Sequence, residues 1–228
     1  MVFLSRITII RTRSEDTEME NTIGEYKGTT TVAAVCNDGV IMATDTRATM
    51  GSYVASKHAK KVYQITDQLA MTIAGGVAAA QRVVDILKVN AKLYNLEKGR
   101  PMPVAAAAML VSNILFSNRE VGAPLPLQAL IGGVDLTGPH VYNLDPYGSL
   151  TEETMVSTGS GSPFAYGVLE DRYKEDSSVA EMAPIVVKAV DSAMKRDVAS
   201  GDNFDVAVIT SDGFKELSEE EKIALLES

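Results

Sequence analysis

The chain contains very few of the side chains on which most hydrolytic and metal sites depend. Cys36 is the only cysteine, and His58 and His140 are the only histidines. A single cysteine excludes an intrachain disulfide and a cysteine-based zinc cluster, and two distant histidines leave few candidates for a histidine-based triad. Because Cys36 lies in the apolar run 32–36, we expect an inert core thiol, and this cysteine usage favours a reducing cytoplasm.

Long apolar runs and excess positive charge are also missing. No stretch approaches the ~20 apolar residues of a membrane span. The apolar residues 1–10 are interrupted by Arg6 and lack the basic start and cleavage pattern of a signal peptide. A net charge of −9 argues against nucleic acid and anionic membranes as partners. The 228 residues suffice for one domain with a sizeable core.

Strand and turn signals predict hairpins rather than βαβ units. An Asn37-Asp38-Gly39 turn separates the first two expected strands, and a Thr137-Gly138-Pro139 turn separates a later pair. The strands are expected at residues 30–35, 40–44, 62–65, 69–74, 127–134, 140–144 and 204–210.

Apolar stripes at helical spacing lie between these strands. The stripes are Val83, Leu87, Ala91 and Tyr94; Val104, Ala108, Val111 and Leu115; and Val179, Met182, Val186, Val190 and Met194. The last of these helices is expected to reach about Ser200. Another is expected to begin with Ser162 as N-cap before Pro163, and Ser218 with Glu221 forms a capping box for a short C-terminal helix. This order predicts an α+β fold: a four-layer αββα sandwich of two antiparallel sheets flanked by helices.

Thr29 is the most informative residue, because a cut between Gly28 and Thr29 would make it a chain terminus. A threonine hydroxyl is a poor nucleophile that needs a base. A terminal threonine carries its own base, the α-amine, whose unperturbed pKa is near ~8. Residues 14–25, which include Glu15, Asp16, Glu18 and Glu20, are acidic and polar, and the composition changes at Gly28. These preceding residues are typical of a weakly structured leader.

Three charged residues are candidates for supporting this threonine. Asp45 and Arg47 follow an apolar strand, and Lys61 directly precedes residues 62–65. An inward-pointing lysine at a strand start needs a carboxylate, for which Asp45 is the natural partner. A positive charge near Thr29 would help to deprotonate its hydroxyl and lower the pKa of its amine. The alternative is that all three are solvated surface charges.

Three glycine- or serine-containing sites remain ambiguous from spacing alone. Gly75 and Gly76 offer backbone N–H groups suited to an oxyanion hole, although a plain turn fits equally well. Residues 158–162 resemble a phosphate loop but lack a following lysine, and ordinary capping explains Ser162. Asp197 and Ser200 can face the same side of a helix end, where capping or surface roles are the simplest interpretation.

Taken in order, these segments resemble the β subunits of archaeal 20S proteasomes from about Thr29 to Thr210. The matching segments are residues 28–32, 40–51, 59–65, 71–75, 157–164, 166–170, 195–197 and 200–201. The resemblance implies the N-terminal nucleophile hydrolase fold and no cofactor. It also implies roles: Thr29 as nucleophile and base, Asp45 and Lys61 as charged supports, and Gly75 as oxyanion donor. Ser160, Asp197 and Ser200 would surround the terminal amine. Ala48, Thr49, Ala59, Ile73 and Val77 would form the substrate pocket, where an apolar Ile73 favours hydrophobic residues before the cut.

The resemblance further divides the chain into a propeptide, residues 1–28, removed by autolysis, and a catalytic domain, residues 29–228. Implied partners are other β subunits in a heptameric ring, α subunits, an ATP-dependent unfoldase and unfolded polypeptide. One departure is Ala33, where the family usually has glycine. Two alternatives stay open: a non-catalytic structural subunit, and a small-molecule amidase on the same fold.

Overall fold

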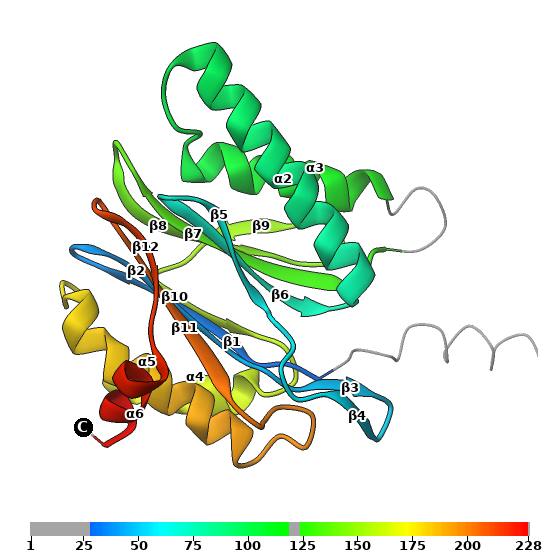
Figure 1. The fold of residues 1–228 in the computed structure, drawn as a ribbon, viewed down its shortest axis with the longest axis vertical. Helices are drawn as coiled ribbons and strands as arrows, with labels where there is room; N and C mark the ends of the chain where they lie inside the picture. Colours follow the sequence, from blue (N-terminus) through cyan, green and yellow to red (C-terminus); the bar gives the residue numbers. More distant parts are fainter. Residues whose placement is uncertain (1–27, 119–123, 228) are drawn as a thin grey trace, which may run out of the picture.

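The computed structural model describes residues 28–118 and 124–227, which form a four-layer sandwich (Figure 1). Two five-stranded sheets lie face to face, with α2 and α3 covering the outer face of one and α4 and α5 that of the other. The helices are α2 (Val77–Lys98), α3 (Val104–Asn118), α4 (Ser162–Arg172), α5 (Val179–Met194) and α6 (Glu219–Glu227). The predicted α+β sandwich is confirmed. Residues 1–27 of the expected propeptide lie outside the described residues.

The first sheet carries the chain that follows Thr29. Its order is β10-β1-β2-β11-β12, and its strands are β10 (Met155–Thr158), β1 (Thr31–Cys36), β2 (Gly39–Asp45), β11 (Phe204–Thr210) and β12 (Gly213–Glu216). Strands β1 and β2 form the predicted hairpin, with Thr31 opposite Thr44. Because of this register, Thr29 and Asp45 lie at the same end of the sheet.

The second sheet brings Lys61 and Gly75 to one end in the same way. Its order is β5-β6-β7-β8-β9, and its strands are β5 (Val62–Thr66), β6 (Leu69–Gly75), β7 (Leu127–Asp135), β8 (Gly138–Leu144) and β9 (Leu150–Glu152). Val62 pairs with Thr72, and the Ile73 amide donates to the Lys61 carbonyl at 3.0 Å. A separate hairpin, β3 (Ala48–Met50) and β4 (Tyr53–Ser56), connects β2 to β5.

An apolar core between the sheets fixes their separation. Ala33, Val40 and Met42 of the first sheet pack in one fully buried cluster with residues of the second, including Leu130 and Val141. Ala33 stays in register opposite Met42, so its methyl group is accommodated without a bulge in β1. The apolar stripes predicted for the helices lie in the two outer cores against the sheets, except for Tyr94, which instead lies under the Arg100 guanidinium. A site built from both sheets depends on this packing, in which truncating one large side chain typically costs ~2–5 kcal/mol.

Two predicted helix ends are wrong. The N-cap of α4 is Gly161 rather than Ser162, because the Gly161 amide is held against the Thr29 carbonyl at 3.3 Å and the helix starts directly after it. Helix α5 ends at Met194 rather than near Ser200. The chain turns there because the Ala193 carbonyl accepts from the Arg196 and Asp197 amides. None of the helices in the described ranges is long and apolar enough to cross a membrane.

Candidate active site

Thr29 is buried at the end of the first sheet, with only 3% of its surface exposed. Its hydroxyl donates to the Gly28 carbonyl at 2.7 Å, and its backbone N–H donates to the Ser160 hydroxyl at 3.3 Å. Gly28 and Thr29 line a cavity of about 210 Å³ together with Lys61, from the second sheet. The threonine is therefore accessible from a small pocket rather than from the open surface.

Asp45 and Lys61 form a buried ion pair across the two sheets. The Lys61 Nζ lies 2.7 Å from Asp45 Oδ1, and the two side chains are 7% and 0% exposed. Burial lowers the pKa of the Lys61 ammonium below its ordinary value, although the Asp45 carboxylate opposes that shift. For these two residues, the alternative of solvated surface charges is wrong.

Asp45 is also the acceptor for three backbone N–H groups from separate parts of the chain. Thr30 donates to Oδ1 at 2.8 Å, while Arg47 and Gly201 donate to Oδ2 at 3.0 and 3.1 Å. Hydrogen bonds to an ionised carboxylate are among the stronger ones in proteins. The carboxylate therefore links the residue after Thr29, the lysine and the segment after α5 in one rigid arrangement.

A second polar group lies beside the Thr29 nitrogen. Asp197 Oδ2 accepts from the hydroxyls of Ser160 and Ser200, each at 2.6 Å. The Ser200 hydroxyl also lies 2.7 Å from Thr30 Oγ1. The structure thus brings Ser160, Asp197 and Ser200 together, and Ser200 is fully buried rather than on the surface. The Gly159 and Gly161 amides donate to Gln128 and Thr29, so neither is free for a phosphate.

Gly75 lines the same cavity at the end of β6, and its conformation requires glycine. Its φ is +120°, and a Cβ built there would lie 2.0 Å from the Pro126 carbonyl oxygen. The close approach of Pro126 therefore excludes a side chain at this position, and Gly75 contributes to the cavity wall. A backbone N–H in such a position has the steric freedom that an oxyanion donor needs.

The rest of the cavity wall is largely apolar. Ala48, Ala59, Ile73 and Val77 all line it, as the resemblance implied, whereas Thr49 instead accepts from the Gly28 amide at 3.3 Å. Three further lining residues, Lys60, Tyr63 and Gln81, were not assigned to the site from the sequence. Tyr63 could have been found, because it lies two residues after Lys61 and side chains two apart on a strand share a face.

Arg47 lines the cavity and is anchored to the segment that follows α5. Its Nε lies 2.8 Å from Asp202 Oδ2, and its Nη1 donates to the Val198 carbonyl at 2.8 Å. The guanidinium is therefore committed to Asp202 and Val198. It connects the start of β3 to the segment that carries Ser200 and Gly201.

A sandwich of two antiparallel sheets between helix layers, with a threonine before the first strand, is the N-terminal nucleophile hydrolase fold. The proteasome subunit family matches residues 25–209. A relative from Methanosarcina mazei, "Proteasome subunit beta", is 52% identical over 196 residues, covering 86% of this chain and 92% of the relative. Relatives with the same description from Ferroglobus placidus and Archaeoglobus profundus are each 52% identical, over 203 and 204 residues. Both alignments cover 89% of this chain, with 96% and 94% of the respective relatives. The chain therefore belongs to the proteasome family, as a subunit of the β type. Members of this family assemble with other subunits into a proteasome core, and its β subunits are generally threonine proteases.

Proposed function

We propose that this chain is a catalytic β subunit of the 20S core, a threonine endopeptidase whose nucleophile is Thr29. The observation that carries the proposal is the meeting of Thr29 with the Lys61–Asp45 pair in one small cavity. A buried lysine held by a carboxylate beside a buried threonine is an arrangement suited to activating a hydroxyl. The position of this costly buried pair beside Thr29, rather than its burial alone, supports a catalytic role.

The first reaction of Thr29 is removal of residues 1–28. Its hydroxyl oxygen attacks the Gly28 carbonyl carbon, the hydroxyl proton passes to the leaving nitrogen, and the C–N bond between Gly28 and Thr29 breaks. The product is an ester on Thr29 Oγ1 and a free α-amine. Water then hydrolyses the ester to a Gly28 carboxylate and restores the hydroxyl. The 2.7 Å contact between the hydroxyl and the Gly28 carbonyl oxygen supports this intramolecular attack.

The freed amine then serves as the base for peptide hydrolysis. It takes the proton from Oγ1 as the oxygen attacks the substrate carbonyl, and the Lys61 charge stabilises the developing alkoxide. The Gly75 N–H stabilises the oxyanion. Ser160, Asp197 and Ser200 orient the amine through the contact that Ser160 already makes with the Thr29 nitrogen. Water completes the cycle by hydrolysing the acyl ester.

The apolar cavity wall favours substrates with a hydrophobic residue before the cut. Ile73 is 5% exposed and lines the cavity with Ala48 and Ala59, and none of the described residues that line it is acidic and able to pair with a basic residue. Fluorogenic peptides ending in Leu, Tyr, Arg or Glu test this point. We expect Leu and Tyr to be cleaved fastest, and a preference for Arg would contradict the pocket assignment.

As its setting we propose a heptameric β ring between α rings in the cytoplasm, fed with unfolded polypeptide by an ATP-dependent unfoldase. Confinement of Thr29 inside the rings would supply the selectivity for unfolded polypeptide. The 210 Å³ cavity around Thr29 does not itself distinguish one protein substrate from another.

The deciding experiment is the N-terminus of the chain in assembled, peptide-digesting particles. Intact mass should show a chain that begins at Thr29. Thr29→Ala should keep residues 1–28 and show no peptidase activity, whereas Thr151→Ala, an exposed control on β9, should mature and cleave normally. Active particles whose chain still begins at Met1 would eliminate Thr29 as nucleophile, and inactive particles whose chain keeps residues 1–28 would favour a structural subunit.

A further inference from the structure

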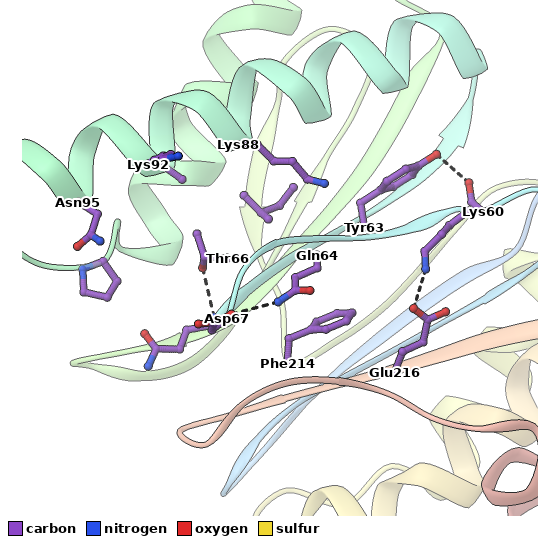
Figure 2. Close-up of a pocket in the computed structure, with 14 residues that line it drawn as sticks. Lys60, Tyr63, Gln64, Thr66, Asp67, Lys88, Lys92, Asn95, Phe214 and Glu216 are labelled. Atoms are coloured by element: carbon purple, nitrogen blue, oxygen red, sulfur yellow. Dashed lines mark hydrogen bonds and ion pairs between the residues drawn. The ribbon is translucent and has the colours of Figure 1, made fainter.

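A second and larger cavity, of about 1080 Å³, lies between α2 and the strands β5 and β12 (Figure 2). We call it the edge groove. Lys88, Lys92 and Asn95 border it from α2, and Phe214 and Glu216 border it from β12 (Figure 2). The mechanism proposed above uses none of these side chains.

Two walls of the edge groove are edge strands. Within the described residues, β5 pairs only with β6, and β12 pairs only with β11. Each strand therefore leaves one row of backbone N–H and C=O groups without a strand partner. Such an edge is a template for an added extended segment, which gains affinity from main-chain hydrogen bonds. The geometry thus suits an extended polypeptide better than a compact small molecule.

The edge groove is lined by three lysines, Lys60, Lys88 and Lys92, and by two acidic residues, Asp67 and Glu216, so its small excess of positive charge favours an acidic occupant. Lys88 and Lys92 are exposed and lie one turn apart on α2, so their like charges repel. In residues 28–118 and 124–227, the ion pair that bridges this groove is Lys60 with Glu216 at 2.6 Å, and neither Lys88 nor Lys92 takes part in one. Two unpaired ammonium groups above an edge strand would be complemented by carboxylates on a bound segment.

The edge groove adjoins the Thr29 cavity. Lys60 and Tyr63 line both spaces, and the Tyr63 hydroxyl donates to the Lys60 carbonyl at 2.9 Å where they meet. Gly28, the first described residue, lines the Thr29 cavity but not the edge groove. An extended segment from residue 15 to residue 27 spans up to ~40 Å, and the lining that the two spaces share at Lys60 and Tyr63 offers it a path from the Thr29 cavity to the groove.

We propose that the edge groove binds the acidic residues 14–25 of the same chain, as a strand added to β5. Glu15, Asp16, Glu18 and Glu20 supply the carboxylates that Lys88 and Lys92 lack. The docking rests on the proposed function only in treating residues 1–28 as a leader, and it requires no peptidase activity. Docking holds Gly28 in the Thr29 cavity until the peptide bond between Gly28 and Thr29 is cleaved. Cleavage ends the covalent link between the leader and the domain. The effective concentration of residues 14–25 at the edge groove then falls, and the segment dissociates.

The test uses the full chain carrying Thr29→Ala, so that the leader stays attached, and measures amide hydrogen exchange at β5. Lys88→Gln with Lys92→Gln should reduce the protection of the β5 amides that point away from β6 by about three- to tenfold. Lys98→Gln, on the same helix outside the groove lining, is the matched control and should leave it unchanged. Neutralising Glu15, Asp16, Glu18 and Glu20 to their amides should produce the same loss.

Combining the lysine substitutions with the leader substitutions distinguishes direct pairing between the two groups from a general loss of protection at β5. The combined variant should lose no more protection than either set alone, because both remove the same contact. Additive losses, or no loss in either set, would overturn the proposal. Protection that rises with protein concentration and survives neutralisation of the leader would assign the groove to a second copy instead. Failure of the native chain to cut itself, with the coupling intact, would defeat only the proposed function.

Discussion

Lys60 and Lys61 are neighbours in the sequence, and each pairs with a carboxylate at nearly the same distance. Lys60 lies 2.6 Å from Glu216 and Lys61 lies 2.7 Å from Asp45. Their surroundings differ completely: the Lys60 and Glu216 side chains are 50% and 38% exposed, whereas those of Lys61 and Asp45 are 7% and 0% exposed. An exposed pair contributes ~0–1 kcal/mol, while breaking a buried pair costs ~3–5 kcal/mol.

The difference shows that contact distance alone says little about an ion pair. Successive residues entering β5 point to opposite sides, so one lysine reaches the core between the sheets and the other reaches the solvent. The buried lysine is held in a fixed position, and burial lowers its pKa. The same local sequence therefore supplies a rigid chemical group and an adaptable surface charge.

The largest loss is expected when the buried carboxylate is removed. Asp45→Ala leaves the Lys61 charge unpaired. It also leaves the backbone N–H groups of Thr30, Arg47 and Gly201 without their acceptor. We expect the free energy of unfolding to fall by about 3–5 kcal/mol. Urea denaturation measures this fall, with Asp45→Asn as a control that keeps an acceptor oxygen. A fall below about 1 kcal/mol would mean that the pair is not buried in solution.

Removal of the buried lysine should be milder for folding but as severe for chemistry. After Lys61→Met, Asp45 still accepts from its three backbone donors, so we expect a loss of about 1–3 kcal/mol. Intact mass should show a folded chain that keeps residues 1–28. If this variant matures normally, the role of the lysine charge in activating Thr29 is wrong.

The exposed pair provides the contrasting case. Lys60→Met should change the free energy of unfolding by at most about 1 kcal/mol. Added salt should abolish even this difference, because exposed charges are screened at a Debye length of ~3 Å in 1 M salt. Denaturation of the native chain and of Lys60→Met at low and high salt measures both effects. A large, salt-independent loss would place Lys60 in the same class as Lys61.

Cys36 is a case in which burial, rather than an ion pair, is the main cause of a shifted pKa. The expected change in the free energy of unfolding at neutral pH is the smallest of the four predictions. Burial, with the Asp38 charge, raises the pKa of its thiol from 9.0 to about 12. A raised pKa stabilises the fold below pH 9, and this contribution is lost as the pH rises toward 12, because the unfolded thiol ionises first. Relative to Cys36→Ala, the native chain should lose roughly 2 kcal/mol between pH 8 and 10.5. Equal losses in both chains would show that the thiol is accessible.

The fold was predictable where one segment carries a complete signal. The hairpin at Asn37-Asp38-Gly39 and the stripe of α3 are found where periodicity and turn chemistry put them. The short strands β3, β4, β9, β10 and β12 were missed, because three or four residues show no clear alternation and their pairing depends on neighbours far along the chain.

The contacts of the candidate site likewise divide into those that the sequence predicts and those that it does not. The pairing of Asp45 with Lys61 could be inferred, since a lysine at a strand start needs a carboxylate. The Gly201 amide on Asp45, and the contact of Ser160 with Asp197, had no signal in spacing. Both depend on how the segment after α5 packs against residues 28–30, which only the folded chain determines.

The close approach of Ala199 to Gly28 restricts how the junction before Thr29 can be redesigned. A Cβ on residue 28 would lie 1.7 Å from the Ala199 Cβ, so any larger residue would displace the segment that carries Ser200. A foreign protease recognition sequence that ends in a bulky amino acid therefore cannot be placed before Thr29 without displacing the segment that carries Ala199 and Ser200. Under the proposed function, engineered activation is therefore confined to tags that end with glycine.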